Sequence, residues 1–216
     1  MKCSGEELIF FSSIVSKDNL FAMELDIGEE EKRESFVDNT MDKLQKNGLV
    51  HPDKLLTIPG IRMLEAIVDY KLASKHVIIN NMRIALVGGM NAITMIQCGE
   101  NEYEVMRLPR IAIVLAVITS YPFLKEANAE ISTNEEVVSK SRLLKIMREE
   151  ESEKLIVREY HGINSKQEIL YRMDAQGGIR YDLKTGNSRP ANPSEIRRAL
   201  IECLRINGEQ YGRVID

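Results

Sequence analysis

Residues 76–106 read HVIINNMRIALVGGMNAITMIQCGENEYEVM, and this stretch decides the fold class. Runs rich in β-branched and other apolar residues, at 76–80, 82–87, 92–97 and 103–106, are separated by short segments that contain Gly or Asn. Apolar runs joined by such short turns are typical of successive β-hairpins. We therefore predict antiparallel strands over this part of the chain.

Helical patterns lie on both sides of these strands. Met63, Leu64 and Ile67 recur at helical spacing and predict a helix that begins near Thr57. On the other side, an apolar segment begins at Pro109. We interpret it as a buried helix, because proline is tolerated in the first turn of a helix.

The same order of elements recurs further along the chain. We predict, in order, a helix, a strand, a loop and a hairpin at Thr133–Met147, Lys154–His161, Ile163–Ser165, and Gln167–Asp174 with Ile179–Leu183. A last helix is predicted to begin at Asn192. The fold class is therefore predicted as α+β, a central antiparallel sheet flanked by helices. A single domain over 1–216 would hold N-terminal helices within 4–56 and two α-β-β-β-α halves, roughly 57–124 and 133–206.

Composition limits the classes of function. The chain has 216 residues, of which 44% are hydrophobic and 29% charged, so an ordinary core and a soluble surface are expected. The net charge of −4 argues against non-specific binding of nucleic acid, which needs a basic face. The longest uncharged run, Ile111–Leu124, is shorter than the roughly 20 residues that span a bilayer. Acids occur early in the chain, at Glu6 and Glu7, so we expect no signal peptide and a cytoplasmic location.

Residues that carry chemistry are few and scattered. The histidines and cysteines have no partners at metal-ligand or triad spacing: His51, His76, His161, Cys3, Cys98 and Cys203. No Lys-Ser or Lys-Thr follows the Gly-Gly pairs, so they are read as hairpin turns and not as phosphate loops. We expect no catalytic, cofactor or metal site. An enzyme with an unfamiliar site, such as one for nucleotides, stays open as an alternative.

Three short motifs resemble the EspG family of cytoplasmic chaperones in type VII (ESX) secretion of Gram-positive bacteria. Ser4–Leu8 resembles the T-x-x-E-L helix start of that family, and Leu44–Leu49 resembles the L-x-x-x-G-L that follows. Gly178–Asp182 is similar in kind to its late strands. The predicted order of elements also resembles the quasi-twofold arrangement of the family.

The resemblance implies a divergent, non-catalytic chaperone or adaptor from a Gram-positive bacterium. Such a protein covers an aggregation-prone helical tip of its cargo and keeps it soluble until export. The implied cargo is a secreted helical protein of the LXG or WXG type. We expect the exposed hairpin tip and the outer side of the final helix to make the grip, through Gly88, Gly89, Met90, Asn91, Arg197 and Arg205.

A DNA-binding regulator is the alternative of a different class. The predicted helix within Glu34–Val50, followed by a second helix at Ile58–Ala73, has the order of a winged-helix protein. Arg197 and Arg198, with two further arginines nearby, make the final helix the most basic element. No second basic helix supports nucleic-acid binding, so the chaperone hypothesis is preferred.

Overall fold

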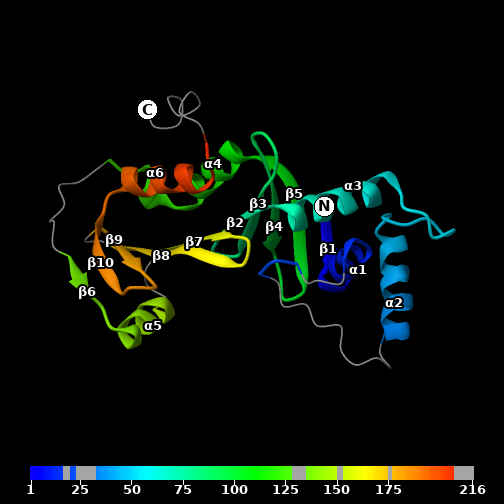
Figure 1. Cartoon of the computed structure of the whole chain (residues 1–216), viewed down its shortest axis with the longest axis horizontal. Coiled ribbons are helices and arrows are strands. Elements are labelled where there is room, and N and C mark those ends of the chain that lie inside the picture. Colours follow the sequence, from blue (N-terminus) through cyan, green and yellow to red (C-terminus); the bar gives the residue numbers. More distant parts are fainter. Residues whose placement is uncertain (17–19, 23–32, 128–134, 150–152, 175–176, 207–216) are drawn as a thin grey trace. The chain divides into compact units, whose positions relative to one another are not determined.

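The computed structural model describes residues 1–16, 20–22, 33–127, 135–149, 153–174 and 177–206 (Figure 1). Contacts between residues divide the chain into two compact units. The first unit comprises residues 1–74, 81–88 and 92–107, and the second comprises 75–80, 89–91 and 108–216. The single domain and its two predicted halves stay a prediction.

The first unit combines three helices with antiparallel strands. Its elements are β1 (Lys2–Ser4), α1 (Gly5–Val15), α2 (Arg33–Lys46), α3 (Ile58–Leu72), β3 (Met82–Leu86), β4 (Asn91–Gln97) and β5 (Glu102–Pro109). The strands are hydrogen-bonded in the order β1-β5-β4-β3. Buried side chains of α1 and α3, such as Phe11, Ile67 and Tyr70, form one core with Ile93 and Met95 of β4.

Side-chain caps fix where the helices of this unit begin. The Ser4 hydroxyl accepts a hydrogen bond from the Glu7 amide at 3.3 Å, and the Glu7 carboxylate accepts one from the Ser4 amide at 2.7 Å. This reciprocal capping box satisfies two amides that have no partner inside a helix. Thr57 caps α3 by accepting from the Gly60 amide at 3.2 Å. Both predicted helix starts are confirmed.

The second unit is built on a longer run of strands. Its elements are β2 (Lys75–Ile79), α4 (Arg110–Ser120), the 3-10 helix η2 (Pro122–Lys125), β6 (Glu136–Val137), α5 (Lys140–Arg148), β7 (Glu153–His161), β8 (Asn164–Asp174), β9 (Gly177–Asp182), β10 (Asn187–Ala191) and α6 (Pro193–Cys203). The strand order is β2-β7-β8-β9-β10-β6, and each of these pairs is antiparallel. The predicted α+β class with antiparallel strands is confirmed.

Strand register gives the second unit two different faces. Leu170 of β8 and Tyr181 of β9 are paired, and both pack in one core with Leu143 and Ile146 of α5. Residues on the opposite side of the same strands, such as Tyr171, face α6 and line a pocket. Figure 1 shows α5 on one side of β8 and β9, and α6 with α4 on the other.

Strand pairing corrects some of the local predictions. Residues 136–137 form β6 against β10 and not the helix start predicted within Thr133–Met147; α5 begins only at Lys140, capped by Ser139. The predicted loop at Ile163–Ser165 is a tighter turn, because β8 already begins at Asn164. The strands β1 and β10 were not predicted.

Asn80 joins β2 to its surroundings in the second unit. Its backbone is left-handed, with φ 50°. Its side-chain amide donates to the Lys154 carbonyl at 3.1 Å and to the Tyr121 hydroxyl, and its side-chain oxygen accepts from the Ile156 amide at 2.7 Å. One side chain therefore ties the end of β2 to β7 and to the residue after α4.

Replacing Asn80 by Ala should lower the free energy of unfolding by about 1–2 kcal/mol. Three hydrogen bonds are lost, each worth roughly 0.5–1.5 kcal/mol less what water restores at this exposed position. Ala also tolerates the left-handed backbone of residue 80 less well than Asn, which adds to the loss. Urea unfolding followed by circular dichroism measures the change. The matched control is Asn81→Ala, whose side chain makes one such bond, to the Gln97 carbonyl. Equal losses in the two variants would contradict this role for Asn80.

Candidate functional site

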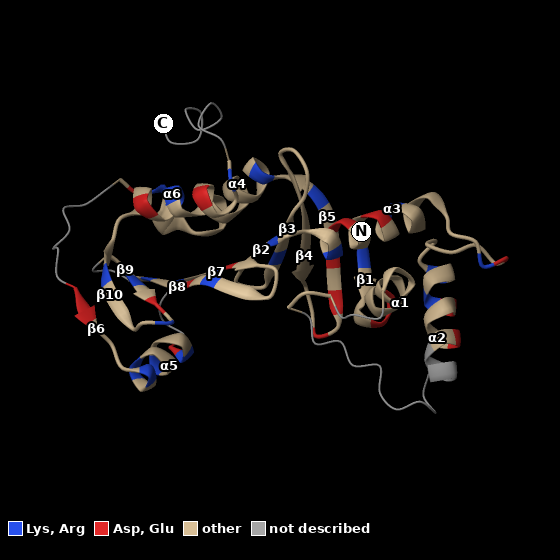
Figure 2. Cartoon of the chain, viewed as in Figure 1, with Lys and Arg blue, Asp and Glu red and all other residues tan. Residues whose placement is uncertain are grey.

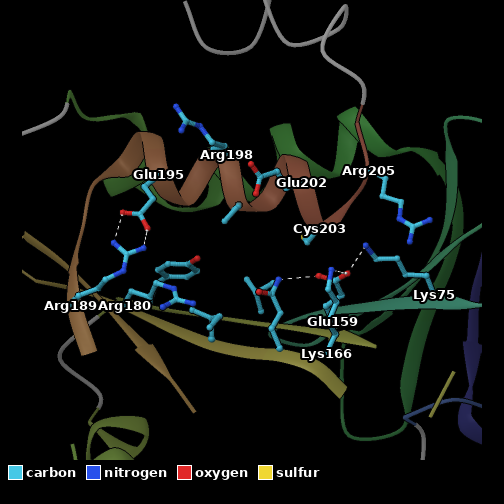
Figure 3. Close-up of a pocket in the computed structure, with 15 residues that line it drawn as sticks. Lys75, Glu159, Lys166, Arg180, Arg189, Glu195, Arg198, Glu202, Cys203 and Arg205 are labelled. Atoms are coloured by element: carbon cyan, nitrogen blue, oxygen red, sulfur yellow. Dashed lines mark hydrogen bonds and ion pairs between the residues drawn. The ribbon is translucent and has the colours of Figure 1, made fainter. Parts of the chain in front are cut away.

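A pocket of about 460 Å³ lies in the second unit between α6 and the strands beneath it (Figure 3). The strands contribute one face of the sheet, since Glu159 is paired with Gln167, and Tyr171 with Arg180. Most lining side chains are polar or charged. They are Lys75, Val157, Glu159, Lys166, Gln167, Ile169, Tyr171, Arg180, Arg189, Glu195, Arg198, Ala199, Glu202, Cys203 and Arg205.

An ion pair inside the pocket is almost fully buried. The Lys75 ammonium lies 2.7 Å from the Glu159 carboxylate, and the two residues are 4% and 2% exposed. The same carboxylate accepts from Lys166 at 3.3 Å and from the Gln167 side-chain amide at 3.0 Å. Burial raises the pKa of Glu159, but hydrogen bonds and charges from Lys75 and Lys166 outweigh it, so this pKa lies below its ordinary value. Glu159 is therefore a carboxylate at neutral pH.

The opposite end of the pocket holds a second, more exposed pair. Two guanidinium nitrogens of Arg189 on β10 donate to the two carboxylate oxygens of Glu195 in the first turn of α6. This two-pronged geometry fits the planar groups of both side chains. The hydrogen bond that Arg189 donates to Glu195 raises the pKa of Arg189, which stays charged.

Positive charge exceeds negative charge in the lining. The lining residues include six lysines and arginines and three glutamates, and without Arg198, whose side chain points away, the formal excess is two positive charges. Within the described residues, Arg180, Arg198 and Arg205 have no carboxylate within ion-pair distance. Figure 3 shows Arg180 between the strands and α6, whereas Arg198 points away on the outer side of that helix. The pocket can therefore attract an anion.

The buried cysteines of the chain are not nucleophiles. Burial raises the pKa of Cys203 in the pocket wall, and that of Cys3 in the first unit, to about 12. Both thiols keep their protons at neutral pH, and the thiolate is the reactive form. Among the described ranges, His, Cys, Asp and Glu form no group of three that could hold a metal ion.

The predicted hairpin tip connects β3 to β4. Gly88, Gly89 and Asn91 are at least partly exposed and Met90 is half-buried. Gly89 has a φ of +67°, a backbone conformation that favours glycine. Four of the residues predicted for partner binding, Gly88 to Asn91, thus lie at the surface of a tight turn.

Arg110 brings this tip together with Arg205. Its backbone amide donates to the Met90 carbonyl at 2.9 Å and its Nε to the Asn91 carbonyl at 3.1 Å. Its Nη1 donates to the Arg205 carbonyl at 3.4 Å. Sequence reasoning missed Arg110, although a single Arg directly before the apolar run Ile111–Leu124 is a usable signal.

Arg197 lies in a different place. Its guanidinium donates to the carbonyls of Leu124 and Glu126, at the end of η2. Side-chain contacts therefore link Arg197 to η2, and the contacts of the described residues do not link it to the tip. Of the predicted partner-binding residues, Met90, Asn91 and Arg205 form one group and Arg197 stands apart.

No helix in the described ranges is both long and apolar enough to cross a membrane.

These features define an α+β protein with antiparallel strands, an exposed hairpin tip and a cationic pocket. The chain belongs to the family described as "Domain of unknown function (DUF5081)", whose sequence profile matches residues 2–184. Among curated proteins, none matches the sequence.

A solved structure shares the fold. The chain is similar to the Mycobacterium tuberculosis type VII secretion system chaperone EspG5, solved in complex with a PE25–PPE41 dimer. The similarity has a TM-score of 0.50 and covers 94% of this chain and 95% of EspG5, at 9% sequence identity. At that identity it concerns the fold alone, and the predicted EspG-like fold is confirmed at this level.

Proposed function

We propose that this protein is a non-catalytic chaperone or adaptor of a type VII secretion pathway that binds a helical secreted protein. The observation that carries the proposal is the similarity in fold to EspG5 over nearly the full length of both chains. The proposal includes a cytoplasmic location, a Gram-positive source and a divergent place among EspG-like proteins. The substrate would be of the LXG or WXG type, in place of the PE–PPE dimer named for EspG5.

The group formed by Met90, Asn91 and Arg205 is the proposed centre of partner binding. Met90 offers a flexible, polarizable side chain that adapts to an apolar helical tip. Arg205 is exposed and offers a cation for a carboxylate or a helix carboxyl end. Arg110 holds the backbone of both parts, so the two contacts would be presented together.

Charge on the helices argues against the DNA-binding alternative. On α3, the second helix of the predicted winged-helix order, exposed Arg62 is accompanied by exposed Glu65 and half-buried Asp69. On α6, Glu195 and Glu202 alternate with the arginines, as Figure 2 shows by the interspersed colours. Carboxylates repel phosphates, so neither helix offers the basic face that DNA needs.

The first test identifies the partner and then reconstitutes the complex. The tagged protein is recovered from the organism that encodes it, and the proteins bound to it are identified by mass spectrometry. The partner is then purified and mixed with the chaperone in gel filtration. A stoichiometric complex with a secreted helical protein is the expected result. Recovery of nucleic acid alone would overturn the proposal and favour the regulator.

Met90→Ala and Arg205→Gln are each expected to weaken binding of that partner about tenfold or more. Truncating a central interface residue costs more than about 1 kcal/mol, and roughly 1.4 kcal/mol is tenfold. Isothermal titration calorimetry measures the affinities, and circular dichroism checks that the fold is kept. Ile163→Ala is the control, because it removes an apolar side chain that is 89% exposed in the turn between β7 and β8. Wild-type affinity in both Met90→Ala and Arg205→Gln would show that the partner binds elsewhere on the protein.

A further inference from the structure

We propose that the pocket beneath α6 binds a small ligand that carries a phosphate group. This site shares Arg205 with the proposed partner-binding group, but it does not depend on the chaperone function. Its volume of about 460 Å³ falls in the range of small-molecule sites, roughly 300–1,000 Å³. The many charged side chains of its lining favour a charged ligand over an apolar one.

The pocket holds more cations than carboxylates that could neutralise them. Glu159 is held by two lysines, Lys75 and Lys166, so this cluster alone keeps a surplus of one positive charge. Arg180, on the neighbouring β9, adds a guanidinium that has no carboxylate within ion-pair distance in the described part of the chain. A ligand that enters would meet positive charge from both places.

The lining also supplies neutral hydrogen-bond donors. Tyr171 is 3% exposed, and burial raises the pKa of its phenol, which therefore keeps its proton at neutral pH. Gln167 already donates to Glu159 and fixes the carboxylate in place. A fork-shaped guanidinium, an ammonium and a phenol hydroxyl together match the several acceptor oxygens of a phosphate group.

Burial of the Lys75–Glu159 pair gives the site its rigidity. Both side chains are more than nine-tenths buried and cannot follow a ligand outward. Lys166 has a side chain that is 63% exposed and stands at the mouth, where it can exchange part of its contact with Glu159 for a phosphate oxygen. The buried pair therefore forms the rigid floor of the pocket, and Lys166 and Arg180 are the groups expected to touch the ligand.

The test is calorimetric titration of the full chain with pyrophosphate and with inorganic phosphate, at low and constant ionic strength. Pyrophosphate is expected to bind at one site, more tightly than inorganic phosphate. Arg180→Gln should weaken it about tenfold or more, since charged hydrogen bonds are among the stronger ones. Lys166→Gln should weaken it several-fold, and in this variant Lys75 still pairs with the buried Glu159 carboxylate. Lack of saturable binding by pyrophosphate would overturn the proposal.

Two further variants separate a specific site from general attraction. Arg158→Gln removes a cation from β7 at a residue that is not part of the pocket lining, so it should leave binding unchanged. Glu195→Gln removes the partner of Arg189 and should tighten binding about threefold or more, because an extra unpaired cation then lines the pocket. Equal weakening by Arg158→Gln and Arg180→Gln would show non-specific attraction and overturn the proposal, as would a Glu195→Gln variant that binds no tighter.

Discussion

Glu159→Gln is expected to lower the free energy of unfolding by about 3–5 kcal/mol, the cost of leaving one member of a buried ion pair unpaired. Lys75, 4% exposed, would lie beside a neutral amide and near Lys166, without a carboxylate between the two amines. Urea unfolding followed by circular dichroism measures the loss. The control is Asp69→Asn, which breaks the exposed pair with Arg107 and should cost less than about 1 kcal/mol. Similar losses in both variants would contradict the role given to burial.

The pH dependence of stability is a second test of the contribution of the buried Lys75–Glu159 ion pair. The pKa of Glu159 is lowered in the folded state, so the carboxylate contributes stability above its unfolded pKa, roughly 4.3, and loses it as pH falls through the folded pKa. Wild-type protein should therefore lose stability below about pH 4 more steeply than Glu159→Gln. Urea unfolding midpoints of both proteins, measured across that pH range, test this expectation. Parallel pH dependences of the wild type and Glu159→Gln would contradict it.

Gly60→Ala is expected to destabilise the first unit by about 3 kcal/mol, because the site has no room for a methyl group. A Cβ at this position would lie 2.0 Å from the Leu49 carbonyl oxygen and 3.3 Å from a methyl group of Leu56. That carbonyl accepts from the Thr57 amide at 3.1 Å, so it cannot move without loss of a backbone hydrogen bond. The first turn of α3 can lie this close to Leu49 only because residue 60 is glycine.

Gly88→Ala is the matched control for this prediction. A Cβ at Gly88 would meet no atom within 4 Å, and the change should stay within about 0.5 kcal/mol. Thermal and urea unfolding of the two variants should differ clearly in midpoint. A Gly60→Ala variant as stable as Gly88→Ala would mean that α3 shifts away from Leu49 at little cost.

Local patterns in the sequence predicted much of the fold, because strands and caps depend on near neighbours. Alternating apolar residues and Gly turns located β3, β4 and β7, and Ser4 located the start of α1. The strand β10 escaped prediction because Pro190 lies within it, and proline has no amide to donate to a strand partner. The strand β6 escaped it because two residues carry no pattern of their own, and only pairing with β10 makes them a strand.

The candidate site was less predictable, because it depends on residues that the register of distant strands brings together. Lys75 and Glu159 are far apart in the sequence, and neither lies in a motif. Their contact follows from the pairing of β2 with β7, which places Val77 opposite Glu159. Lys75 lies two residues before Val77 and therefore on the same face of the sheet. Arg110 was missed for the same reason, since its partners Asn91 and Arg205 come from two remote segments.

The strand order of the second unit also has a consequence for the time course of folding. Strands β7, β8, β9 and β10 follow one another in sequence and in space, so each pairing closes only a short loop. β2 comes from a distant part of the chain and is expected to join after this local group has formed. The Lys75–Glu159 contact would then arise after the rate-limiting step. In stopped-flow experiments, Glu159→Gln should accordingly speed unfolding and leave the refolding rate almost unchanged.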